Sequence, residues 1–233
     1  MTGGPTARAL LLKHASDPAL NEEVRYEALN ALGLTLREDS SQLGIFLEAL
    51  ASPERLKRLA SLNAMRESTL PGAYLSLQRH WEHEEDSMLK VLLLEVLLKY
   101  PDTDAMAWLH KALDDPDDYL RDKAAFMLAD FSHLPGVAAL YAKALGDESQ
   151  DVRRNALYAL PENPLPGVSE TILFCLQEDD ENMRVAAAKV LVHYRSPDVE
   201  KAVKYAFYKD MLVSVRQAAR DTLAQWGYSY WRK

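Results

Sequence analysis

The chain has 233 residues, of which 48% are hydrophobic, and its 27 lysines and arginines against 35 aspartates and glutamates give a formal net charge of −8. This size and apolar content suffice for a buried core, which excludes an intrinsically disordered or fibrous protein. Binding to phosphate backbones draws on clustered basic residues. The acidic balance therefore argues against nucleic acid as a partner.

The single cysteine, Cys175, excludes an intramolecular disulfide and a cysteine-based zinc site, which is typical of a protein in a reducing compartment. The segment from Met1 to Pro5 does not resemble a signal peptide. The richest apolar stretch, from Val91 to Leu98, is interrupted by Glu95 and is too short to span a bilayer. We expect a cytoplasmic protein with no membrane partner.

One nine-residue segment recurs along the whole chain. Val24–Leu32 closely matches Val152–Leu160, and five weaker copies lie at Lys57–Met65, Leu89–Leu97, Leu120–Leu128, Met183–Leu191 and Val215–Leu223. The second position of every copy is basic, with spacings of 33, 32, 31, 32, 31 and 32: Arg25, Arg58, Lys90, Arg121, Arg153, Arg184 and Arg216. Apolar residues recur at offsets zero, four, five and eight, which predicts one buried face of an α-helix.

A second helical pattern precedes each copy, for example at Gly136–Leu145, Gly167–Leu176 and Asp198–Tyr208. Proline, which is tolerated in the first turn of a helix, is expected to begin several of these helices, at Pro71, Pro101, Pro135, Pro166 and Pro197. Each unit is thus a helical hairpin of about 31 residues, too short to bury its own apolar face, so that neighbouring hairpins must stack.

The sequence therefore predicts a single all-α domain over residues 1–233, folded as a right-handed α-solenoid, or α-α superhelix. About seven hairpins are expected, at approximately 6–36, 40–68, 70–99, 101–132, 135–162, 166–195 and 197–226. An aromatic segment, 227–233, is expected to cap the last hairpin, with Tyr228 and Trp231 folding over its end after a break at Gly227. The alternative is a free aromatic peptide that docks into another subunit.

The pattern Val-Arg-x-x-Ala-Leu-x-Ala-Leu, preceded by an acidic turn, resembles the HEAT repeat over residues 7–226. It is most similar to the short bacterial variety named after phycobilisome lyases, and the resemblance implies an armadillo-like superhelix. In such proteins the acidic residue of the turn and the basic residue of the second helix form a ladder between neighbouring units. The residues that match its acidic positions, six residues before Arg121, Arg153 and Arg216, are Asp115, Asp147 and Asp210.

The first two units depart from the ladder pattern, because Asp17 stands two residues too early for Arg25 and Ser52 replaces the acid before Arg58. Glu84 and Glu178 take the acidic position before Lys90 and Arg184. Acidic residues crowd nearly every turn, at Glu22–Glu23, Glu82–Asp86, Asp114–Asp118, Asp147–Asp151, Glu178–Glu181 and Asp210. Helix capping accounts for part of this pattern. We also hypothesise an acidic rim along which a basic partner docks.

The concave surface of a solenoid is the usual binding surface, and offsets two and six of the recurring helix should face it. We interpret residues at these offsets as the partner-binding surface: Tyr26, Asn30, Leu59, Asn63, Val91, Glu95, Asp122, Phe126, Arg154 and Tyr158. Apolar and aromatic residues flanked by polar ones are typical of a protein-binding patch. The competing interpretation is that tight curvature buries Val91 without any partner. The expected partner is another protein or a peptide segment.

Enzymatic alternatives rest on weaker patterns. His80, His83 and Glu84 are spaced as metal ligands on a helix, and the pair His83-Glu84 resembles one of the His-Glu pairs of HEAT-like deoxyhypusine hydroxylases. The other units carry no such pair, so we expect no metal. Cys175 lies between apolar neighbours and is expected to be a buried, inert thiol. No catalytic constellation and no cofactor-binding motif are visible.

HEAT-like alkylpurine DNA glycosylases and bilin lyases of the phycobilisome type remain the two enzyme alternatives. The chain is similar to the glycosylases in length and repeats, but carries Glu95, Asp122 and Asp221 on the expected concave surface. It shares the repeat itself with the lyases, and Phe126, Arg154 and Tyr158 could line a chromophore pocket. The sequence favours a non-enzymatic protein-binding module or scaffold.

Overall fold

The structure is a computed structural model in which residues 5–34, 40–66, 69–70, 72–101, 103–160, 164–178 and 180–229 are described. Within these ranges all regular structure is helical and no strand occurs. The chain divides into two compact units, Met1–Asp104 (unit 1) and Ala105–Lys233 (unit 2), and each is described by itself. Within the described residues, no helix combines the length and the apolar character needed to cross a membrane.

The described residues of unit 1 form three helical hairpins. They are α1 (Pro5–Ser16) with α2 (Glu22–Gly33), α3 (Leu43–Leu50) with α4 (Arg55–Arg66), and α5 (Tyr74–Trp81) with α6 (Ser87–Leu98); a short 3-10 helix, η1 (Ser40–Gln42), precedes α3. Helix α4 packs against both α2 and α6. The three helices that carry the recurring segment therefore form one layer.

In unit 2, the part of the chain that the structure describes forms four hairpins. They are α7 (Ala105–Leu113) with α8 (Asp118–Met127), α9 (Val137–Leu145) with α10 (Gln150–Ala159), α11 (Ser169–Glu178) with α12 (Glu181–Val190), and α13 (Pro197–Lys209) with α14 (Val213–Gln225). The 3-10 helices η2 (Leu128–Phe131) and η3 (Leu191–His193) extend α8 and α12. The all-α stack of HEAT-like hairpins expected from the sequence is confirmed.

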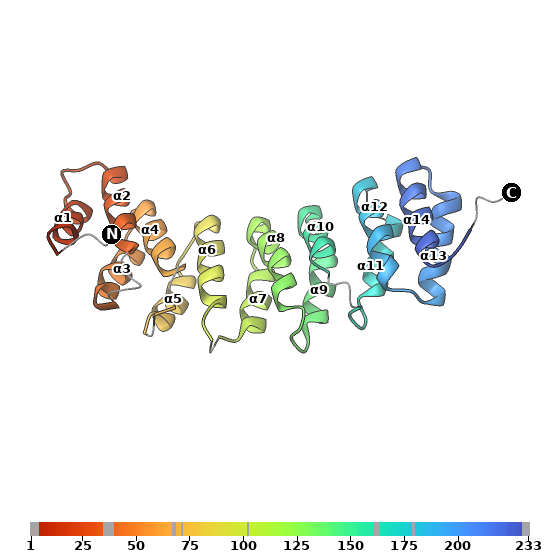
Figure 1. Ribbon diagram of the computed structural model, residues 1–233, viewed down its shortest axis with the longest axis horizontal. Helices are drawn as coiled ribbons and strands as arrows, with labels where there is room; N and C mark the ends of the chain where they lie inside the picture. The colour runs from red at the N-terminus through yellow and green to blue at the C-terminus, as the bar shows by residue number, and fades with distance from the viewer. Residues whose placement is uncertain are drawn as a thin grey trace. The chain divides into compact units, whose positions relative to one another are not determined.

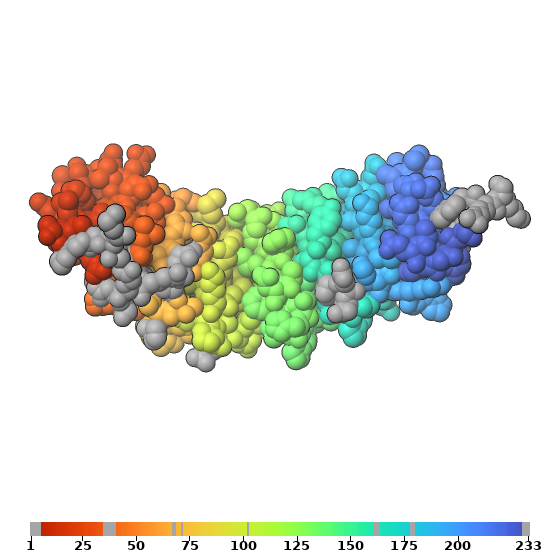
Figure 2. Space-filling view, in the orientation of Figure 1, coloured from red at the N-terminus to blue at the C-terminus, as the bar shows by residue number. Residues whose placement is uncertain are grey.

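The helices of unit 2 form two layers, with α8, α10, α12 and α14 in the upper layer of Figure 1 and α7, α9, α11 and α13 in the lower one. Side chains fill the spaces between successive ribbons (Figure 2). Alanines at the central offsets are completely or almost completely buried, for example Ala124, Ala156 and Ala187. Small side chains at these positions let neighbouring helices approach closely. The recurring alanines thus lie in the core of the unit.

The prolines between hairpins behave differently from the prediction. Pro197 does lie at the start of its helix, α13, and Pro71 lies outside the described residues. Helices α7, α9 and α11 begin two to four residues after Pro101, Pro135 and Pro166. After Pro135 and Pro166 the chain turns at Gly136 and Gly167, which have φ values of +86° and +80°. Such positive φ angles favour glycine, so Pro-Gly here marks a turn before the helix.

Candidate functional site

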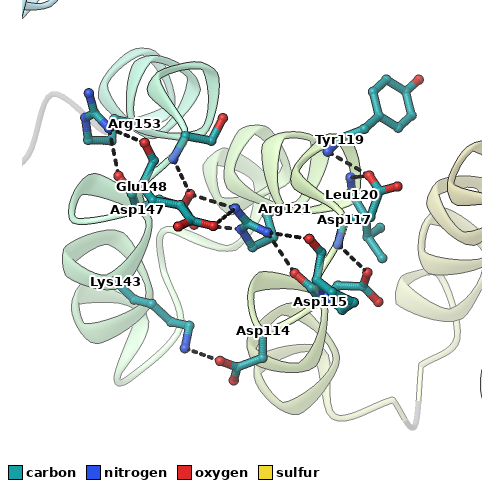
Figure 3. Close-up of polar contacts among 12 residues, drawn as sticks. Asp114, Asp115, Asp117, Tyr119, Leu120, Arg121, Lys143, Asp147, Glu148 and Arg153 are labelled. Carbon is teal, nitrogen blue, oxygen red and sulfur yellow. Dashed lines mark hydrogen bonds and ion pairs between the residues drawn. The ribbon is translucent and has the colours of Figure 1, made fainter.

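A buried arginine links successive repeats of unit 2 (Figure 3). Arg121 on α8 donates from Nε to Asp147 Oδ2 at 2.8 Å and from Nη2 to Asp147 Oδ1 at 3.1 Å. Its Nη1 donates to the backbone carbonyls of Asp115 and Pro116 at 2.9 and 3.1 Å. The guanidinium therefore binds the turn of its own hairpin and the turn of the next one. We call each such arrangement a ladder contact.

Ladder contacts recur in both units. Arg184 Nε lies 3.0 Å from Asp210 Oδ2, and Arg58 Nε lies 2.8 Å from Glu84 Oε2. Arg25 Nη2 lies 2.8 Å from Glu54 Oε2. Glu54 therefore supplies the carboxylate of this ladder contact, because Ser52 stands at the position that is acidic in the later turns. Arg153 and Arg216 donate to the carbonyls of their own turns, at Asp147, Glu148, Asp210 and Met211. Lys90 places its ammonium 5.4 Å from the centroid of the Trp81 ring.

Several acidic turn residues also accept hydrogen bonds from the backbone. Asp115 and Asp147 accept the N–H groups two residues later, at 3.0 and 2.8 Å. Asp86, Asp117 and Asp180 accept N–H groups in the first turns of α6, α8 and α12. Free N–H groups at a helix start favour a carboxylate there. Part of the predicted acidic rim thus consists of carboxylates that hold the turns in place.

Glu84 belongs to a buried ionic cluster in unit 1. Its side chain is 1% exposed, and Oε2 lies 2.8 Å from Arg58 Nε and 2.9 Å from His80 Nε2. Burial opposes ionisation of this carboxyl, but hydrogen bonds from Arg58, the Asp86 N–H and His80 outweigh it and hold the pKa below its ordinary value. The residues described include no group of three or more His, Cys, Asp or Glu that could hold a metal ion.

In unit 1, the predicted partner-binding residues are mostly covered. Tyr26, Asn30, Leu59 and Asn63 are half-buried. Glu95 is half-buried, and its Oε2 lies 3.7 Å from Arg66 Nη1. Val91 is only 7% exposed, which corrects the interpretation of this residue as a partner contact. The physical reason is that α6 buries apolar residues on several sides, so that Val91 belongs to the core.

In unit 2, the same offsets carry two exposed aromatic residues. Phe126 on α8 is 60% exposed and Tyr158 on α10 is 63% exposed. These helices pack directly against each other. Tyr119, seven residues before Phe126 and hence on the same side of α8, is 40% exposed. We call Phe126, Tyr158 and Tyr119 the aromatic surface. The spacing of seven residues between Tyr119 and Phe126 is the sequence signal by which Tyr119 could have been predicted as part of it.

Asp122 does not extend this surface as predicted. It is 8% exposed, accepts a hydrogen bond from Asn155 Nδ2 on α10, and lies 2.9 Å from Lys123 Nζ. Its carboxylate therefore joins α8 to α10 beneath the aromatic surface, where it could not set the register of a partner. Arg154 is half-buried and forms an ion pair with Asp151, one turn earlier on the same helix.

Two further predicted features are engaged within unit 2. The Cys175 thiol is fully buried and lies 3.9 Å from the Leu145 carbonyl oxygen. Tyr228 folds back onto α13, where Lys204 Nζ lies 4.3 Å from its ring centroid and its hydroxyl hydrogen-bonds Glu200. Hydrogen bonds from Lys204 and Tyr228 lower the pKa of Glu200 to about 2. Trp231, the other predicted cap residue, lies outside the described residues.

Comparison with known proteins agrees with this architecture. The model of the HEAT-repeat family matches residues 82–160 and 137–224, which together span more than half of the chain. No curated protein matches the chain. HEAT repeats generally mediate contacts between proteins. The repeated hairpins, the ladder contacts and this match together show that the chain belongs to the HEAT-repeat family.

Proposed function

We propose that this protein is a non-enzymatic binding module that holds a segment of a partner protein on the aromatic surface of unit 2. The observation that carries the proposal is the exposure of Phe126 and Tyr158, at 60% and 63%, on two helices that pack together. Large aromatic side chains dominate binding energy at protein interfaces because they bury much area at little cost in conformational entropy.

Two exposed carboxylates close in sequence to residues of the aromatic surface support a partner with basic side chains. Asp118 is exposed beside Tyr119, and Asp130 is exposed four residues after Phe126. Lys123 and Arg154, by contrast, are already paired with Asp122 and Asp151. The segment that we propose therefore carries large apolar side chains flanked by lysine or arginine. Its charge should mainly increase the association rate and make binding sensitive to salt.

The scaffold role is supported by how the candidate catalytic groups are used. Glu84, the most buried carboxylate of the His80–Glu84 segment, is held by Arg58 and by the Asp86 N–H. The Cys175 thiol is fully buried. We retain a cytosolic location of the protein as part of the proposal. A labelled DNA duplex tests the glycosylase alternative, and a free bilin tests the lyase alternative; we expect neither to bind at physiological salt.

The proposal is tested with a Phe126→Ser/Tyr158→Ser variant. Wild-type and variant proteins are used as bait in extract from the cells of origin, and proteins recovered are compared quantitatively. The matched control is Phe174→Ser, which removes an aromatic side chain of similar exposure from α11, outside the aromatic surface and outside the cleft between α11 and α13. We expect one set of partners to be lost from the double variant and retained by the control. Identical recovery by wild type and double variant would refute the proposal.

A further inference from the structure

A second surface of unit 2 lies in the other helix layer. A cleft of about 820 Å³ opens between α11 and α13, which pack against each other. Its lining includes Leu176, Ala202 and Ala206, of which Leu176 and Ala206 are buried. Clefts of this volume are within the range that binds ligands in proteins. This cleft is formed by odd-numbered helices, whereas the aromatic surface is formed by even-numbered ones.

The wall of the cleft on α13 combines aromatic and basic side chains. Lys201, Tyr205, Tyr208 and Lys209 all line it, at relative positions 0, 4, 7 and 8, which places them on one side of the helix. Tyr205 is 68% exposed and Tyr208 is 58% exposed. From Lys201 to Lys209 the helix rises by about 12 Å. This length suits a short peptide segment laid along the helix.

The charge of the lining that is not neutralised locally is mainly positive. Lys204 forms an ion pair with Glu200, and Asp210 forms one with Arg184. Lys201 and Lys209 are exposed and make no ion pair with any other residue that the structure describes. Asp198, the remaining carboxylate of the lining, lies in the first turn of α13 and can offset only one of them.

We propose that this cleft binds an acidic peptide segment of a partner protein, with an apolar side chain against Leu176 and Ala206 and carboxylates toward Lys201 and Lys209. Single-stranded nucleic acid also stacks on aromatic residues between basic ones. Two available cations and an aliphatic floor suit a segment with few negative charges and an apolar side chain, which favours the acidic peptide. The protein would then hold a basic segment on one layer of unit 2 and an acidic segment on the other.

The test begins with a phage-displayed library of random twelve-residue peptides, selected on the full-length protein. Affinity of the most enriched peptide is then measured by fluorescence anisotropy. We expect peptides that combine Asp or Glu with Leu, Ile or Phe, and we expect Lys201→Glu/Lys209→Glu to weaken binding about tenfold or more. The matched control is Lys13→Glu/Lys189→Glu, which reverses two exposed lysines elsewhere and has the same net charge.

Equal weakening by the control, or the absence of any selected peptide that depends on Lys201 and Lys209, overturns the proposal. So does binding of an oligouridine twenty-mer that the cleft variant abolishes, or a dimer in sedimentation velocity that the same variant dissociates. Tyr205→Ala should weaken binding of the peptide without unfolding the protein, since this side chain is mostly exposed. The Phe126→Ser/Tyr158→Ser variant should bind the peptide as wild type does, so the two proposals fail separately.

Discussion

Arg121 and Asp147, twenty-six residues apart in the chain, are joined by two parallel hydrogen bonds of 2.8 and 3.1 Å between their guanidinium and carboxylate groups. Both side chains are nearly buried, with 9% and 11% of their areas exposed. A bidentate pair of this kind fixes orientation as well as distance. It therefore sets how one hairpin of unit 2 is placed on the next.

Arg121→Ala should destabilise the protein by about 3–5 kcal/mol, because it leaves the Asp147 carboxylate buried without its partner. The free energy of unfolding is measured by urea denaturation followed by circular dichroism. Arg154→Ala is the control, since its ion pair with Asp151 is 40% and 64% exposed and should contribute less than about 1 kcal/mol. Equal effects of the two substitutions would show that the ladder contact has no special role.

Stability should fall as the solution is acidified, and Glu84 should account for part of the loss. Its pKa is held below its ordinary value in the folded protein, so its contribution is present above the pKa of the unfolded chain and disappears as the pH falls through the folded pKa. The unfolding free energy is measured between about pH 7 and pH 3, spanning the ordinary glutamate pKa. Glu84→Gln should flatten the decline; an unchanged slope contradicts this assignment.

Gly33→Ala should destabilise unit 1 by about 1–3 kcal/mol, because overpacking forces neighbouring atoms to move. A Cβ atom at position 33 would lie 2.6 Å from the Cβ of Ala64, where α2 and α4 pack together. Gly44→Ala is the control, since nothing lies within 4 Å of its added Cβ, and should be neutral or slightly stabilising. Thermal melts of both variants decide the matter.

Tyr228→Ala should lower the melting temperature, since it removes the ring on Lys204 and the hydrogen bond to Glu200. Tyr205→Ala removes a tyrosine that is 68% exposed and should change the melting temperature less. Differential scanning calorimetry of both variants compares the two positions. If Tyr228→Ala melts like the wild type, the contact of Tyr228 with α13 does not cap the last hairpin.

The hairpins were predictable from the sequence because every repeat places the same residue types at the same offsets. The burial of Val91 and Asp122 was not, because it depends on how neighbouring helices pack rather than on the face of a single helix. Ser52 suggested a missing ladder acid, but two residues further along Glu54 reaches Arg25. The cleft on α13 could not be predicted from the recurring helices, because it lies between two helices of the other layer, although the spacing of Lys201, Tyr205 and Tyr208 is visible in the sequence.

We propose above that Phe126 and Tyr158 contact a partner protein directly. The most direct measurement replaces each in turn by the photoreactive residue p-benzoylphenylalanine, irradiates living cells of origin, and identifies crosslinked proteins by mass spectrometry, with the exposed Leu75 of unit 1 as the control position. We expect positions 126 and 158 to crosslink the same protein and position 75 not to crosslink it. Unrelated proteins at the two positions, or the same protein at all three, would contradict this proposal.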